Sequence, residues 1–269
     1  MPGAYYNEFD PYAAQWLRNL IAAGHIAPGD VDERSIEDVH PDDLKHYTQC
    51  HFFAGIGVWS LALRRAGWPD DRPVWTGSCP CLPFSSAGEG AGFDDPRHLW
   101  PHFAWLIRQR RPGEVLGEQV ASKDAEPWLD LVQADLEAME YAFGAIAFPS
   151  AGIGAPHIRD RTYWVANAIM PERSDGQSGI GFADDPKGRL EGATTSTGLR
   201  SDCSPGPVNG LWTDADWIFC RDGKWRPVEP GTFPLAHGAP SRVGRLRAYG
   251  NAINAEAATQ FIAAYMETS

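Results

Sequence analysis

The 269-residue chain has few cysteines, and their arrangement excludes two common kinds of site. The five cysteines include one close pair, Cys79 and Cys81, but no pair with the C-x-x-C spacing of a zinc site. They also lack the regular spacing of a disulfide-rich secreted domain. We therefore expect no metal site and a reducing, cytoplasmic location.

Long apolar runs and an excess of positive charge are also missing. No run approaches the roughly 20 apolar residues that cross a bilayer, and no basic-then-apolar signal opens the chain, so we expect no membrane association. The chain has 23 lysines and arginines against 35 acidic residues, a net charge of −12. Because phosphate neutralisation supplies much of the affinity for DNA, a nucleic-acid contact would need a local basic face. The candidates are Arg159, Arg161, Arg242, Arg245 and Arg247.

Strand-like and helix-like segments alternate through the first 170 residues. The strands are expected at 49–53, 73–77, 114–118, 141–148 and 162–166, and the helices at 10–24, 58–66, 98–111 and 127–139. This alternation predicts an α/β fold with a doubly wound, mainly parallel sheet and helices on both faces. A hydrophobic content of 43% is enough for one sizeable core and a small extra lobe.

The composition changes after residue 170. Residues 171–207 are rich in Gly, Ser, Thr, Asp and Pro, and a small cluster of aromatic residues follows. We therefore divide the chain into a core at 1–170, a partly flexible lobe at 171–239 and a segment that returns to the core at 240–269.

A cysteine at the end of a strand is the most informative feature of the chain. Cys81 lies in the turn Pro80-Cys81-Leu82-Pro83-Phe84-Ser85, directly after the strand predicted at 73–77. A thiol in such a place is positioned for nucleophilic attack. The alternative is a buried structural cysteine, which is the role we assign to Cys79.

Four further blocks accompany this turn: Phe53-Ala54-Gly55-Ile56-Gly57, Gly117-Glu118-Gln119-Val120, Pro156-His157-Ile158-Arg159-Asp160-Arg161 and Tyr249-Gly250-Asn251-Ala252-Ile253. The first three have an ordinary explanation alone: a nucleotide-binding turn of any α/β protein, a surface glutamate and a salt-bridged strand edge. Together the blocks resemble the DNA (cytosine-5)-methyltransferase family, over most of residues 1–170 and again at 240–269.

The resemblance implies a Rossmann-like, S-adenosylmethionine-dependent methyltransferase with a catalytic group drawn from these blocks. Cys81 would add to carbon 6 of cytosine, and Glu118 would act as the acid near ring nitrogen 3. Arg161 would hold the carbonyl oxygen of the base, and Arg159 would support the site or a DNA phosphate.

The resemblance also implies a cofactor site whose parts occur in an unusual order. Glu8 would take the ribose hydroxyls, Phe9 would stack on adenine and Asp32 would accept the adenine amine. The glycine turn (Phe53, Ala54, Gly55, Gly57) and the later Asn251 and Ala252 would complete the pocket. In the family the block that corresponds to Glu8 and Phe9 and the block that corresponds to Asp32 usually follow the glycine turn, whereas here both precede it. A compact chain of this kind is similar to the modification enzymes of phages and prophages. We therefore expect it to act in a bacterial or phage-infected cell.

Double-stranded DNA is the expected partner, and its target base must leave the stack for carbon 6 to be reached. Ser85 and Arg97 are expected to contact DNA. Residues 171–239 would recognise its sequence, with Arg221, Lys224 and Arg226 as readers, unless these are solvated surface charges. We expect a monomer; whether a restriction nuclease is its partner stays open.

Three alternatives remain open at this point. An RNA cytosine-5 methyltransferase would share the same core. A catalytically weakened DNA-binding homologue would fit Val58 and Leu82, where the family typically has Gly and Gln. A modified donor could also deliver a group larger than methyl.

Overall fold

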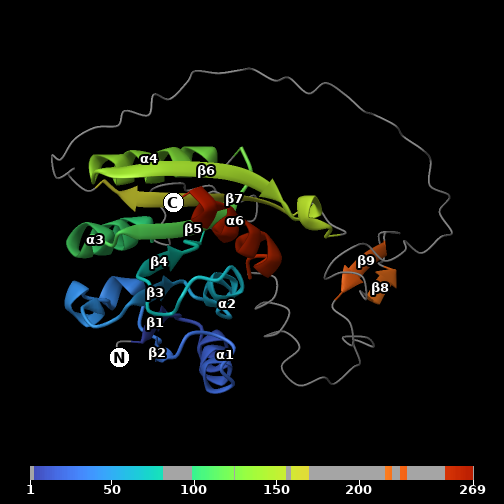
Figure 1. Ribbon diagram of the computed structural model, residues 1–269, viewed down its shortest axis with the longest axis horizontal. Helices are drawn as coiled ribbons and strands as arrows, with labels where there is room; N and C mark the ends of the chain where they lie inside the picture. The colour runs from blue at the N-terminus through green and yellow to red at the C-terminus, as the bar shows by residue number, and fades with distance from the viewer. Residues whose placement is uncertain are drawn as a thin grey trace.

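A seven-stranded sheet forms the centre of the molecule (Figure 1). The structure, a computed structural model, describes residues 3–80, 99–123, 125–155, 159–169, 216–219, 225–228 and 252–268. The strands of the large sheet are β1 (Ala4–Asn7), β2 (Gly29–Asp32), β3 (Gln49–Phe52), β4 (Val74–Gly77), β5 (Glu114–Val120), β6 (Tyr141–Pro149) and β7 (Asp160–Ala168). A second, two-stranded sheet pairs β8 (Asp216–Phe219) with β9 (Trp225–Val228) in antiparallel fashion.

The strand order β2-β1-β3-β4-β5-β7-β6 shows where the N-terminal strands lie. β3 is parallel to both β1 and β4, so the first two strands of the chain occupy the sheet edge beside β3. β7 runs antiparallel between β5 and β6. The predicted doubly wound, mainly parallel α/β sheet is therefore confirmed.

Helices cover both faces of this sheet. Successive side chains of a strand point to opposite faces, so each face has its own apolar core for helices to cover. On one face, α1 (Pro11–Ala22), α2 (Val58–Arg65) and α6 (Ala255–Thr268) pack against side chains such as Tyr6, Leu116 and Tyr163. The other face packs against α3 (Trp100–Arg110), α4 (Glu126–Ala138) and the short 3-10 helices η1 (Ile36–Asp38) and η2 (Pro41–Leu44). A third 3-10 helix, η5 (Ser150–Ile153), follows β6. Among the described residues, no helix is both long and apolar enough to cross a bilayer.

Local signals explain where several helices begin and end. Asp10 caps α1 by accepting hydrogen bonds from the backbone of Tyr12 and Ala13, and Pro11 occupies the first helical position. α2 begins after Gly57, which has a φ of 77° that glycine adopts readily. The five strands and four helices predicted for the core all occur, with ends that differ by one or two residues. The domain boundaries at 170 and 239 stay predictions.

Candidate active site

Strand β5 carries Glu118 to the carboxyl end of the sheet and buries it. Glu118 is only 8% exposed and lies two residues after Leu116, on the face covered by α2 and α6. It is paired in register with Tyr163 of β7. Gly117 precedes it because a Cβ there would overlap the Trp164 indole. The sequence thus places a carboxylate where water is largely excluded.

Two arginines surround this carboxylate. The Arg161 Nε lies 2.6 Å from Glu118 Oε1, and both side chains are mostly buried. Burial raises the pKa of the Glu118 carboxyl above its usual value, while Arg161 and Arg159 oppose the rise. Burial and the neighbouring Arg161 lower the pKa of the Arg159 guanidinium, which Glu118 partly restores. Such a carboxyl can hold or release a proton nearer to neutral pH than an exposed glutamate can.

The segment that precedes Cys81 is held by hydrogen bonds from two elements. The Trp59 indole of α2 donates to the Ser78 hydroxyl at 3.0 Å, and the Ser78 hydroxyl bonds the Glu118 carboxylate. The buried Gln119 amide donates to the Cys79 carbonyl at 3.2 Å. Cys79 itself is a buried free cysteine, in agreement with a structural role. The chain therefore leaves the end of β4 in a direction fixed by β5 and α2.

Arg159 connects the site to the C-terminal segment. Its Nη2 donates to the Ala252 carbonyl at 2.6 Å, across 93 residues of sequence. Its backbone has a φ of 35°, in the left-handed region that residues other than glycine rarely adopt. Ala252 is followed by Ile253, which is buried in the core beneath α2 and α6. Two blocks that are distant in sequence thus meet beside Glu118.

The N-terminal acidic block lies against the glycine turn. Glu8 directly follows β1, and its carboxylate accepts hydrogen bonds from Gly55 N at 2.6 Å and Asp10 N at 2.8 Å. Phe9 is 72% exposed. In the turn, Phe53, Gly55 and Gly57 all have positive φ, and the Gly55 N–H is the group that donates to Glu8. The rearranged chain order therefore still brings these two blocks together.

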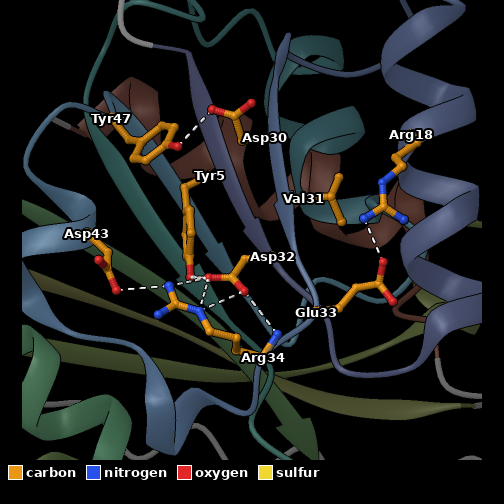
Figure 2. Close-up of a pocket in the computed structure, with 9 residues that line it drawn as sticks. All are labelled: Tyr5, Arg18, Asp30, Val31, Asp32, Glu33, Arg34, Asp43 and Tyr47. Atoms are coloured by element: carbon orange, nitrogen blue, oxygen red, sulfur yellow. Dashed lines mark hydrogen bonds and ion pairs between the residues drawn. The ribbon is translucent and has the colours of Figure 1, made fainter.

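A pocket of about 430 Å³ opens beside the edge strand β2 (Figure 2). Asp32 lies in this pocket, where its carboxylate accepts hydrogen bonds from Tyr5 and Arg34. Arg34 also pairs with Asp43 at 2.9 Å. The partial burial of Asp32 favours a higher pKa, but the hydrogen bonds from Arg34 and Tyr5 outweigh it, so its pKa is lowered. The Asp32 carboxylate therefore already has strong partners in the protein.

The structure brings together many, but not all, of the predicted site residues. Glu118, Arg159, Arg161 and Ala252 form one group, while Glu8, Phe9, Phe53, Ala54, Gly55 and Gly57 form another with Asp32 nearby. Cys81, Ser85, Arg97, Asn251, Arg221 and Lys224 lie outside the described residues, as does the side chain of Arg226. No cluster of three potential metal ligands occurs in the described ranges.

Ser78, Trp59 and Arg34 also belong to these sites, although they were not among the predicted site residues. Ser78 stands three residues before Cys81, which is a signal that could have singled it out. Arg34 stands two residues after Asp32, close enough in sequence to suggest an ion pair. Trp59 gave no comparable local signal, because its partner lies 19 residues away.

Residues 67–173 match the family model for the C-5 cytosine-specific DNA methylase. Type II methyltransferase M.HhaI from Haemophilus parahaemolyticus is 30% identical over 99 residues, which cover 35% of this chain and 30% of that protein. Type II methyltransferase M1.ScrFI from Lactococcus lactis subsp. cremoris is 32% identical over 99 residues, covering 35% of this chain and 25% of that protein. The matched segment thus spans less than a third of either relative. The predicted family resemblance is confirmed.

Two solved structures are similar to the chain at low sequence identity. One is a DNMT2 mutant from Spodoptera frugiperda, with 15% identity and a TM-score of 0.42 over 64% of this chain and 45% of that one. The other is a prophage-encoded protein of E. coli described as a DNA modification methyltransferase, with 18% identity and a TM-score of 0.41 over 61% of this chain and 40% of that one.

Proposed function

We infer that this chain, whose residues 67–173 match the family model for the C-5 cytosine-specific DNA methylase, is a DNA (cytosine-5)-methyltransferase. It would transfer a methyl group from S-adenosylmethionine to carbon 5 of a cytosine extruded from duplex DNA. The observation that carries this proposal is the buried Glu118–Arg161 pair at the end of β5, beside the strand that leads to Cys81.

In this reaction the protein activates a weakly nucleophilic carbon. The Cys81 thiolate forms a bond to carbon 6 of cytosine, and electron density moves toward ring nitrogen 3, where the protonated Glu118 carboxyl donates a hydrogen bond or a proton. Carbon 5 would then form a bond to the methyl group, while the bond between that methyl group and the sulfonium sulfur of the donor breaks and leaves a neutral thioether. Loss of the carbon 5 proton to a base and breakage of the carbon–sulfur bond regenerate the aromatic ring and the thiolate.

The arginines give Glu118 its place and balance its charge. Arg161 holds one carboxylate oxygen, which fixes the direction of the other oxygen, while the buried setting favours the protonated form. A base carbonyl near Arg161 would find a further guanidinium N–H to accept from, because an arginine has five such donors. Arg159 supports this arrangement from behind by binding the Ala252 carbonyl.

The residues around Glu8 fit the donor's nucleoside. The Glu8 carboxylate accepts hydrogen bonds from Gly55 N and Asp10 N, and a carboxylate is also an acceptor that suits ribose hydroxyls. The exposed Phe9 ring is next to this carboxylate and would gain burial by stacking on adenine. When bound, S-adenosylmethionine supplies the methyl group. For Asp32, the predicted contact with the adenine amine would have to compete with Arg34 and Tyr5.

Trapping with 5-fluorocytosine tests this function. In duplex DNA that carries this base, fluorine cannot leave as a cation, so we expect a covalent protein–DNA adduct that survives denaturing electrophoresis. Cys81→Ala should form none, and tRNA of matched cytosine content serves as the control for substrate class. An equally abundant adduct in Cys81→Ala would refute the nucleophile, and an adduct with tRNA alone would refute DNA as the substrate.

A further inference from the structure

The Glu118 carboxylate has a third partner besides the two arginines. Gly77 of β4 is paired in parallel register with Gly117 of β5, so the next residues, Ser78 and Glu118, lie side by side. A hydrogen bond from the Ser78 hydroxyl favours the ionised form of the carboxylate. The Ser78 hydroxyl in turn lies 3.0 Å from the Trp59 indole nitrogen. The three residues come from a loop, a helix and a strand, so their meeting is a product of the fold.

The chemistry of the three groups fixes the direction of each hydrogen bond. An indole N–H can only donate, and a serine hydroxyl has a single proton to donate. Since the indole donates to the Ser78 oxygen, the Ser78 proton is left for the carboxylate. The Trp59 ring is itself held, 4% exposed and edge-on to the Tyr163 ring at 6.2 Å between centroids.

We propose that Ser78 and Trp59 are positioning residues for Glu118: the Trp59 indole orients the Ser78 hydroxyl so that its proton is donated to the neighbouring carboxylate. The proposal rests on the proposed function, in which Glu118 is the acid. It adds a means by which the protein limits how strongly that acid holds its proton. α2, which carries Trp59, begins directly after the glycine turn, so the same helix also borders the predicted cofactor site.

The remaining groups that face Glu118 act in both directions. Arg161 and Arg159 on the neighbouring segment favour the ionised carboxylate. Tyr163, opposite Glu118 on β7, has its own pKa raised by burial and by Glu118, so it stays neutral. Its hydroxyl has no hydrogen-bond partner in the described part of the chain. Ser78 is therefore the neutral group whose orientation adjusts a site otherwise set by two cations and burial.

The test compares the Glu118 pKa between variants in two ways. The ¹³C signal of the Glu118 side-chain carboxyl, assigned with Glu118→Gln, is titrated in the folded protein. The rate of methyl transfer to duplex DNA is measured over the same pH range. We expect Ser78→Ala to raise the pKa by about one unit, since a hydrogen bond to a charged group is lost. The rate should then fall off at a correspondingly higher pH, because the protonated acid persists longer.

Three further variants separate positioning from packing. Ser78→Thr keeps a hydroxyl and should restore the wild-type titration. Trp59→Phe keeps an aromatic ring but loses the N–H, and should shift the pKa in the same direction by less. Once Ser78 is alanine, adding Trp59→Phe should cause no additional shift. Trp68→Phe is the matched control, because Trp68 is a buried indole of the same core whose N–H donates to the Arg72 carbonyl instead.

The outcomes separate this proposal from the proposed function. An unchanged Glu118 titration in both Ser78→Ala and Trp59→Phe, in folded protein, would overturn the positioning role. A shifted titration without any methyl transfer by the wild type would support the positioning role and refute the function. If Ser78→Ala does not fold, the Trp59→Phe titration alone decides, with no shift counting against the proposal.

Discussion

Two carboxylates at the carboxyl edge of the same sheet, Glu118 and Glu8, are stabilised by different means. Glu118 is buried and is balanced by the guanidinium of Arg161 at 2.6 Å, with Arg159 nearby. Glu8 is half-buried and is bound by the backbone N–H groups of Gly55 and Asp10. The contacts described for Glu118 include guanidinium groups, whereas those described for Glu8 are backbone N–H groups of a turn.

The difference teaches which property each site can control. Removing a buried carboxylate from water shifts its pKa, so the surroundings of Glu118 determine when it carries a proton. Backbone N–H groups are fixed by the fold and never titrate, so the surroundings of Glu8 determine where its oxygens point. We therefore expect substitutions at the first site to change chemistry and its pH dependence, and substitutions at the second to change binding.

Replacing the acid should give the largest effect. Glu118→Gln keeps the shape of the side chain but can neither give up nor take a proton, so methyl transfer should slow by on the order of 10²-fold or more. S-adenosylmethionine binding, measured by calorimetry, should stay close to that of the wild type. A variant that binds the donor poorly but turns over normally once saturated would reverse the proposed division between the two sites.

Removing the cation beside Glu118 should have an effect of similar size, on the free energy of unfolding instead of on the rate. Arg161→Gln leaves a buried carboxylate without its ion-pair partner, and the free energy of unfolding at neutral pH should fall by about 3 kcal/mol. The pKa of Glu118 is already raised, and this substitution raises it further. A raised folded-state pKa gives stability that is present below the unfolded pKa and is lost as the pH rises through the folded one.

The deficit of Arg161→Gln should therefore shrink in acid, where Glu118 is protonated in both proteins. Denaturant unfolding at a series of pH values measures this. The combination of Arg161→Gln with Glu118→Gln provides the control, because it has no carboxylate to leave unpaired and should be more stable than Arg161→Gln alone at neutral pH. A deficit that is constant with pH would show that Arg161 acts through packing.

At the Glu8 site, truncation should weaken donor binding without changing the pH dependence of the reaction. Glu8→Ala and Phe9→Ala should each lower the affinity for S-adenosylmethionine roughly fivefold to hundredfold, since each removes a contact of about 1–3 kcal/mol. Calorimetry measures the affinity, and circular dichroism checks the fold. Tyr12→Ala, on the first turn of α1, is the nearby aromatic control. Unchanged affinity in both variants would exclude the N-terminal block from the cofactor site.

The sequence predicted the core elements well because their signals are local. The helix at 127–139 and the strand at 114–118 are marked by apolar spacing within a dozen residues, and the structure contains both as α4 and β5. The N-terminal strand β1 is only four residues long and buried throughout, so its identity depended on the acidic block that follows it. Its place beside β3 results from parallel pairing between residues that are 45 positions apart in sequence, and no local pattern predicts such a pairing.

The candidate site was predicted by residue type but not by partner. Glu118 and Arg161 were both identified, although nothing in the sequence says that they bind each other across the β5–β7 pair. The Trp59 indole reaches Ser78, and the Ser78 hydroxyl reaches the Glu118 carboxylate, only because three elements converge there. Hydrogen bonds between distant segments depend on register and side-chain direction, and these arise from packing of the whole core.

The smallest effect is expected at Asp32. Its carboxylate is bound both by a cation, the Arg34 guanidinium, and by a neutral donor, the Tyr5 hydroxyl. Asp32→Asn should lower the free energy of unfolding by about 1 kcal/mol at neutral pH, since the Arg34 partner is 47% exposed and solvent weakens the pair. The pKa of Asp32 is lowered, so its contribution is present above the unfolded value and is lost as the pH falls through the folded one. The difference between the two proteins should therefore shrink as the pH falls below the ordinary pKa of aspartate and vanish below the lowered folded-state pKa of Asp32. Calorimetry in the same samples shows whether Asp32 also binds the donor: a loss of S-adenosylmethionine affinity of tenfold or more, without a matching loss of stability, would mean that Asp32 exchanges Arg34 for adenine when the donor binds.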